Sequence, residues 1–73
     1  MSATTLTNHQ CLEARKLLGW SLRNLSAQCM VSIDAISRLE RNEGEHQPRT
    51  IRDIRAAFEA AGISFSNGSA RLI

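Results

Sequence analysis

The stretch Ser21–Arg41, SLRNLSAQCMVSIDAISRLER, decides the fold of this 73-residue chain. In each half, apolar residues recur at offsets of three and four, which is the spacing of one face of a helix. These apolar positions are Leu22, Leu25, Cys29, Ile33, Ile36 and Leu39. Ser32 precedes the second run and can cap a helix there. The stretch predicts two short helices, 21–29 and 32–41, joined by a tight turn, with the small Ser26 where they cross.

This pattern resembles the helix-turn-helix of the Cro/repressor-like (XRE-type) DNA-binding family. The matching residues are Ser21, Leu25-Ser26, Met30-Val31-Ser32 and Ile36-Ser37-Arg38-Leu39-Glu40-Arg41, with Leu18-Gly19-Trp20-Ser21 upstream and Ala60-Ala61-Gly62-Ile63 downstream. The resemblance covers nearly the whole chain after the first few residues. It implies a mainly α, four-helix repressor-like domain that binds double-stranded DNA.

Two positions depart from the family pattern. Leu22 stands where the family often has a phosphate-binding Gln, and Met30 stands where the turn usually has Gly. A residue with a side chain at positive φ costs about 1 kcal/mol. The turn is therefore either strained or shifted in geometry.

Length and composition narrow the class of protein. Seventy-three residues allow one domain with a small core. The formal charge of +2 is carried mostly by arginine, which suits bidentate contacts to phosphates and guanine edges. Cys11 and Cys29 lie on apolar faces of different expected helices, so we expect free thiols in a reducing cytoplasm. No signal peptide or membrane span is expected.

The residues before the helix-turn-helix contain one further helix. Residues 1–6 are expected to form a flexible N-terminus. Thr7 is a good N-cap, and Gln10 completes the capping-box spacing, which predicts a helix over 8–18. Gly19 is a typical C-terminal stop, and Trp20 is expected to anchor the core. The helix-turn-helix domain is expected to span 7–62.

The residues after the polar loop 42–48 predict a fourth helix and a hairpin. Thr50 is expected to cap that helix, Gly62 to end it, and Arg52 and Arg55 to lie in solvent. Residues 63–73 alternate apolar and polar around Asn67-Gly68, the strongest two-residue hairpin signal. With that turn, Ile63 faces Leu72 and Phe65 faces Ala70, so one face is consistently apolar.

The second helix of the central stretch is the expected reader of the major groove. By resemblance, its base-contacting residues are Ile33, Asp34 and Arg38. Arg38 can donate two hydrogen bonds to guanine, Ile33 can touch a thymine methyl, and Asp34 can accept from a cytosine amine. Each has an alternative: a surface charge for Arg38, a core position for Ile33, and stabilisation of the helix N-terminus for Asp34.

Contacts to the DNA backbone are expected from several hydroxyl, amide and arginine side chains. They are Ser21, Arg23, Ser32, Ser37, Arg41, Asn42 and Arg49. For Arg49, a solvated surface charge is the alternative. The family also often holds a buried ion pair between its first helix and the end of its third, which implies a pair between Arg15 and Glu40 here. Its expected role is to orient the reading helix.

Taken together, the sequence predicts a cytoplasmic DNA-binding regulator that is more typical of a repressor than of an activator. One such domain makes few phosphate contacts, so a homodimer on a palindromic operator is expected. The hairpin is the candidate dimer interface, through Ile63, Phe65 and Leu72. The alternative is a protein-interaction module or antitoxin that binds a toxin or polymerase subunit. The residues show no catalytic constellation and no metal-ligand spacing, so no enzymatic activity, cofactor or metal is expected.

Overall fold

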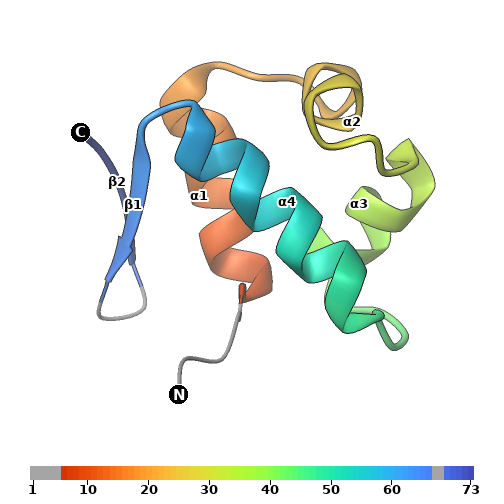
Figure 1. Cartoon of the computed structure of the whole chain (residues 1–73). Coiled ribbons are helices and arrows are strands. Elements are labelled where there is room, and N and C mark those ends of the chain that lie inside the picture. The colour runs from red at the N-terminus through yellow and green to blue at the C-terminus, as the bar shows by residue number, and fades with distance from the viewer. Residues whose placement is uncertain (1–5, 67–68) are drawn as a thin grey trace.

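The computed structural model describes residues 6–66 and 69–73, and in these ranges it contains four helices and one antiparallel hairpin. Their bounds are α1 (Asn8–Leu18), α2 (Leu22–Cys29), α3 (Ile33–Glu40), α4 (Pro48–Ala60), β1 (Ile63–Ser66) and β2 (Ser69–Leu72). In Figure 1, α2 and α3 lie at one end of the molecule and the hairpin lies at the other, with α1 and α4 between them. The predicted mainly α fold with a C-terminal hairpin is confirmed.

The first three helices begin at side-chain caps. Thr7 and Gln10 form the predicted capping box of α1. Ser21 forms a second capping box with Asn24 at the start of α2, and the Ser32 hydroxyl accepts from the Ala35 N–H at the start of α3. Each cap satisfies backbone N–H groups that have no partner within the helix. The expected bounds 21–29 and 32–41 therefore include the capping residues of α2 and α3.

The fourth helix begins earlier than the sequence predicts. Thr50 is not its cap, because α4 begins at Pro48 and its N-cap is Gln47, which makes no side-chain cap hydrogen bond. Pro is well suited to the first turn of a helix, since its φ is already helical and its missing N–H would have no partner there. The fixed backbone of Pro48 thus starts α4 without a side-chain cap. At its other end, α4 ends at Ala60 with Ala61 as C-cap, and Gly62 follows at φ 100°.

A tight turn joins α2 to α3 at Met30. Met30 is the C-cap of α2 and adopts the left-handed conformation with φ 60°. The turn therefore keeps the geometry that usually calls for Gly, and the side chain of Met30 is accommodated at a cost. The Ser26 hydroxyl donates a hydrogen bond of 2.6 Å to the carbonyl of Val31, which ties α2 to the turn.

A single apolar core joins the helices. Leu25 of α2, Ile36 of α3, and Ile54 and Phe58 of α4 have no exposed surface. Trp20 stacks on Phe58 with ring centroids 5.9 Å apart, as expected of a core anchor. Burial of side chains of this size is the main stabilising contribution in a domain of this length. It holds α3 in a fixed orientation on α2 and α1.

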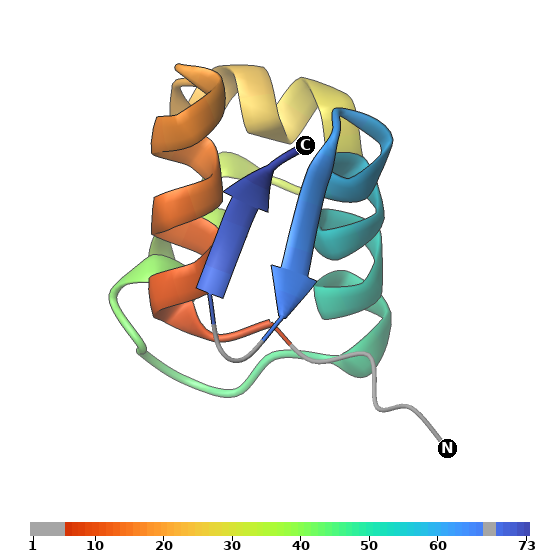
Figure 2. The same ribbon diagram turned by 90° about the vertical axis from the view of Figure 1, so that its left-hand side faces the viewer.

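The hairpin packs on α1 and α4. Its register pairs Ile63 with Leu72 and Phe65 with Ala70, as the sequence predicts, whereas the expected turn Asn67-Gly68 lies outside the described residues. Figure 2 shows β2 beside α1 and β1 beside α4. Ile63 is 2% exposed, so this strand completes the core of its own chain.

Two polar side chains hold the hairpin in place. The guanidinium of Arg55 lies 5.0 Å from the centroid of the Phe65 ring, and Arg55 also pairs with Glu59 at 3.1 Å. The expectation that Arg55 lies in solvent is therefore wrong, because β1 brings an aromatic ring beneath it. On the other strand, the N–H of Ala70 donates to a carboxylate oxygen of Glu13 at 3.0 Å.

None of the helices in the described ranges combines the length and the apolar character that crossing a bilayer requires.

Candidate nucleic-acid interface

Helix α3 presents a polar, accessible face on the side away from the core. Ile36 and Leu39 are buried, whereas Asp34 and Arg38 are exposed and Ile33 is 41% exposed. Asp34 and Arg38 are four residues apart and therefore lie on the same face of the helix. The structure thus brings the three candidate base-contacting residues together on one accessible rod at the end of the molecule opposite the hairpin (Figure 1).

Arg38 lies on this face without a charged partner among the described residues. Within residues 6–66 and 69–73, its side chain makes no ion pair and no hydrogen bond. An open pocket of about 290 Å³ separates Arg38 and Ala35 from the loop before α4. Nε2 of His46 also belongs to this region and is buried without a hydrogen-bond partner. The guanidinium is therefore available to an external acceptor.

The three arginines expected to contact the DNA backbone differ in their ion pairs within the protein. Arg23 is exposed and has no ion-pair partner among the described residues. Arg41 lies 3.4 Å from Glu43, and Arg49 lies 4.0 Å from Asp53 with its side chain 84% exposed. Exposed pairs of this kind contribute little and exchange readily for a phosphate. All three arginines are exposed, and none of them is held in a buried ion pair.

The candidate polar donors have local structural roles. Ser21 and Ser32 use their hydroxyl oxygens as helix caps, which leaves the hydroxyl proton of Ser32 to donate outward, whereas that of Ser21 donates to Asn24 at 2.9 Å. Ser37 is half-buried. Asn42 is exposed and adopts φ 58°, a conformation that Asn tolerates better than most residues. Asn42 therefore shapes the loop as well as presenting an amide.

Arg15 and Glu40 join α1 to the last residue of α3. Nε and Nη2 of Arg15 donate to the two carboxylate oxygens of Glu40 at 2.8 and 3.0 Å, and Nη1 donates to the carbonyl of Trp20. The two side chains are 19% and 10% exposed. The hydrogen bonds to Glu40 raise the pKa of Arg15 above its ordinary value. This bidentate pair fixes the end of α3 against α1.

Both cysteines are free and buried in the core. The thiol of Cys11 lies 3.5 Å from a carboxylate oxygen of Glu40. Burial raises the pKa of Cys11 far above its ordinary value, and the negative charge of Glu40 raises it further. Burial also raises the pKa of Cys29. Neutral thiols of this kind behave as small apolar side chains, and the described residues contain no cluster of His, Cys, Asp or Glu arranged for a metal.

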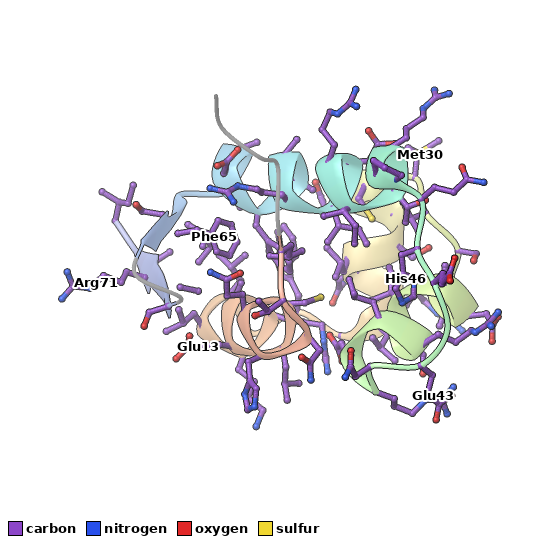
Figure 3. The ribbon with its side chains drawn as sticks, turned by 90° about the horizontal axis from the view of Figure 1, so that it is seen from below. Glu13, Met30, Glu43, His46, Phe65 and Arg71 are labelled. Atoms are coloured by element: carbon purple, nitrogen blue, oxygen red, sulfur yellow. The ribbon has the colours of Figure 1, made fainter. Side chains whose placement is uncertain are left out.

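The three candidate interface residues of the hairpin have different surroundings. Ile63 lies in the core, and Phe65 lies between the hairpin and the helices (Figure 3), with its ring edge on Phe58 at 6.1 Å. Leu72 is 53% exposed, and Ile73 beside it is 90% exposed. The accessible apolar surface of the hairpin is therefore at its last two residues.

Sequence reasoning missed two contacts near these surfaces. The Glu13 carboxylate on the Ala70 N–H joins residues that are 57 positions apart, and the Arg55–Phe65 contact joins a helix to a strand. No local spacing signals either contact. Gly44 lies next to the guanidinium of Arg38. Its residue type indicates a turn, but nothing in the sequence indicates its closeness to Arg38.

Comparison with known proteins agrees with this geometry. A family model described as helix-turn-helix matches residues 12–61, which include α2, the turn at Met30, and α3. The comparisons with curated proteins and with solved structures found no match. The match covers more than half of the chain, and α3 is the second helix of the matched motif. The chain therefore belongs to the XRE-type helix-turn-helix family of DNA-binding regulators.

Proposed function

We propose that this protein is a transcriptional repressor that binds a palindromic operator as a homodimer and lays α3 in the major groove. The observation that carries the proposal is the exposed face of α3, on which Arg38 has no partner among the described residues. A helix is about 10–12 Å across and fits the major groove of B-DNA. Occupation of an operator then blocks the polymerase.

The assigned contacts divide into those that read bases and those that hold the backbone. Arg38 donates to guanine O6 and N7, Ile33 touches a thymine methyl, and Asp34 accepts from a cytosine amine. The exposed arginines around α3, namely Arg23, Arg41 and Arg49, bind phosphates and fix the position of the domain on the duplex. The Arg15–Glu40 pair keeps α3 at one angle to the rest of the domain.

A selection of bound duplexes from random DNA tests the proposal. The expected result is an enriched palindrome whose half-sites are centred about 10 base pairs, or one helical turn, apart. Enrichment of a single half-site would contradict the dimer, and no enrichment above the input pool would contradict sequence-specific binding.

The dimer is proposed to form through the exposed end of the hairpin. Leu72 and Ile73 are the apolar residues of this region that a partner can cover, since Ile63 is already buried. Removal of the whole hairpin would also strip Ile63 and Phe65 from the core, so a surface substitution is the sharper test.

Leu72→Glu is expected to convert the dimer to a monomer in sedimentation equilibrium. Arg71→Gln, on the neighbouring exposed residue, is the control and should leave the dimer intact. A dimer that survives Leu72→Glu would contradict this interface.

One observation favours a second candidate function. Met30 is 88% exposed and lies three residues before α3, which begins at the exposed Ile33. An apolar pair at this position suits a protein partner, such as a toxin or polymerase subunit, that covers the reading helix. Such a partner would compete with DNA for the same face. Met30 is not among the residues assigned to DNA, so Met30→Asp tests the protein contact separately. A Met30→Asp variant that keeps full DNA affinity but no longer binds the protein partner would support this candidate.

A further inference from the structure

The loop after α3 is folded back onto the last turn of that helix. The N–H of Glu43 donates to the carbonyl of Arg38 at 2.9 Å, and the N–H of Asn42 donates to the carbonyl of Leu39 at 3.0 Å. Together with the left-handed Asn42, these bonds form a Schellman motif, which fixes the path of the chain beyond the helix. Figure 3 shows Glu43 and His46 of this loop at the end of the molecule opposite the hairpin. The position of Gly44 relative to Arg38 is therefore set by the backbone.

Gly44 leaves space that the guanidinium of Arg38 occupies. A Cβ atom added to Gly44 would lie 3.0 Å from Nη2 and 3.7 Å from Cζ of Arg38. Gly19, which ends α1, has a similar φ of 68° against 73° at Gly44, yet a Cβ there would meet nothing within 4 Å. The two glycines share a positive φ and differ in what lies beside them. At Gly44 the missing side chain therefore makes room for Arg38.

We infer that Gly44 is a positioning residue that sets the direction and reach with which Arg38 meets a base. The inference rests on the proposed function, in which Arg38 reads guanine. A long arginine side chain loses much rotamer freedom when it is fixed on DNA, and contact with a rigid loop removes part of that freedom beforehand. Within the described residues no carboxylate pairs with Arg38, and the bare backbone of Gly44 lies beside its guanidinium.

Two matched substitutions separate the effect of a side chain placed beside Arg38 from the effect of backbone strain at positive φ. Gly44→Asn places a side chain where the guanidinium lies, and Gly19→Asn places the same side chain in open space at nearly the same φ. Asn tolerates positive φ better than other non-glycine residues, so both variants are expected to fold. For each, affinity is measured for the selected duplex and for single base-pair changes at every position.

The expected result is a loss of discrimination at one base pair of each half-site. Arg38→Ala should lower the preference for that base pair by about tenfold. Gly44→Asn should lower the same preference at least about threefold. In an Arg38→Ala background, Gly44→Asn should have no further effect on the preference. Gly19→Asn should leave the preference unchanged. If Arg38→Ala relaxes one position and Gly44→Asn does not, the positioning role is wrong and the proposed function stands. If Arg38→Ala relaxes no position, the reading role of Arg38 and the positioning role both fail.

A second measurement needs no variant and no DNA. In the unmodified protein, nuclear Overhauser contacts are expected between the guanidinium protons of Arg38 and the Hα protons of Gly44. A side chain of Arg38 that shows no such contact and averages freely over its rotamers would overturn the inference.

Discussion

The strained backbone of a single residue lowers the stability of this protein, and Met30 is the clearest example. Its φ of 60° puts a side chain in the left-handed region, and the side chain is 88% exposed, so almost no packing offsets the strain. The turn between α2 and α3 requires this conformation because α3 must return across α2. A fold this small keeps such a residue at a measurable cost in stability.

Replacement of Met30 by Gly is expected to stabilise the protein by about 0.5–1 kcal/mol, because Gly adopts positive φ without a steric penalty. Unfolding in urea measures the change. Met30→Ala is the control, since it removes the same exposed side chain but keeps a Cβ in the left-handed conformation. A gain in Met30→Ala equal to that in Met30→Gly would show that the side chain, and not the backbone, is responsible.

The two thiols make stability fall in alkaline solution. Burial raises the pKa of Cys11 and of Cys29 above the ordinary value of 9.0, so each thiol stays protonated to a higher pH in the folded chain than in the unfolded chain. Stability is therefore unaffected below about pH 8 and is lost as the pH rises through and above 9, by at most about 1.4 kcal/mol per pH unit for each thiol. Urea unfolding at pH 7.5 and pH 10 measures the loss. The loss should be smaller in a Cys11→Ala/Cys29→Ala variant, and an equal loss in that variant would contradict the account.

At the scale of elements, the orientation of α3 depends on contacts at its two ends. At its start, the turn at Met30 and the Ser32 cap fix it on α2. At its end, Glu40 is held by Arg15 of α1, and both side chains are largely removed from solvent. An ion pair in this setting contributes little net stability but restricts the angle of the helix.

Loss of Glu40 is expected to destabilise the protein, because it leaves Arg15 without its charged partner. Glu40→Ala should cost about 2–4 kcal/mol in the free energy of unfolding. A double-mutant cycle with Arg15→Ala measures the coupling, which should exceed about 1 kcal/mol. Glu59→Ala is the control, because it breaks the more exposed pair with Arg55, and it should cost clearly less. Additive effects of Arg15→Ala and Glu40→Ala would rule out the orienting role.

At the scale of the whole molecule, local signals in the sequence predict most of the fold. Thr7 and Gln10 mark the start of α1, and the alternation around Asn67-Gly68 gives the correct pairing of Ile63 with Leu72. The start of α4 is missed because Gln47 is a weak cap signal and Thr50 is a strong one. The environment of Arg55 could not be predicted, because it depends on how a distant strand packs.

On the exposed face of α3, too, some features follow from local sequence and others depend on contacts with distant residues. The resemblance to the family indicates which residues of α3 point outward, since the positions of the motif are fixed by helix geometry. The contact between Arg38 and Gly44 is different, because it depends on the Schellman motif at Asn42 and on a side-chain rotamer. The sequence therefore predicts the exposed helix α3, and the structure adds the position of Gly44 beside Arg38.

The salt dependence of binding to the selected duplex tests the central claim, that the exposed face of α3 and the arginines around it bind DNA. Counterion release predicts that the logarithm of the binding constant falls linearly with the logarithm of the salt concentration, with a slope of about −0.9 for each phosphate contacted. The removal of Arg23, which has no partner among the described residues, should reduce that slope by about one and leave base preference unchanged. Binding that is independent of salt, or equal affinity for every duplex sequence, would contradict the account.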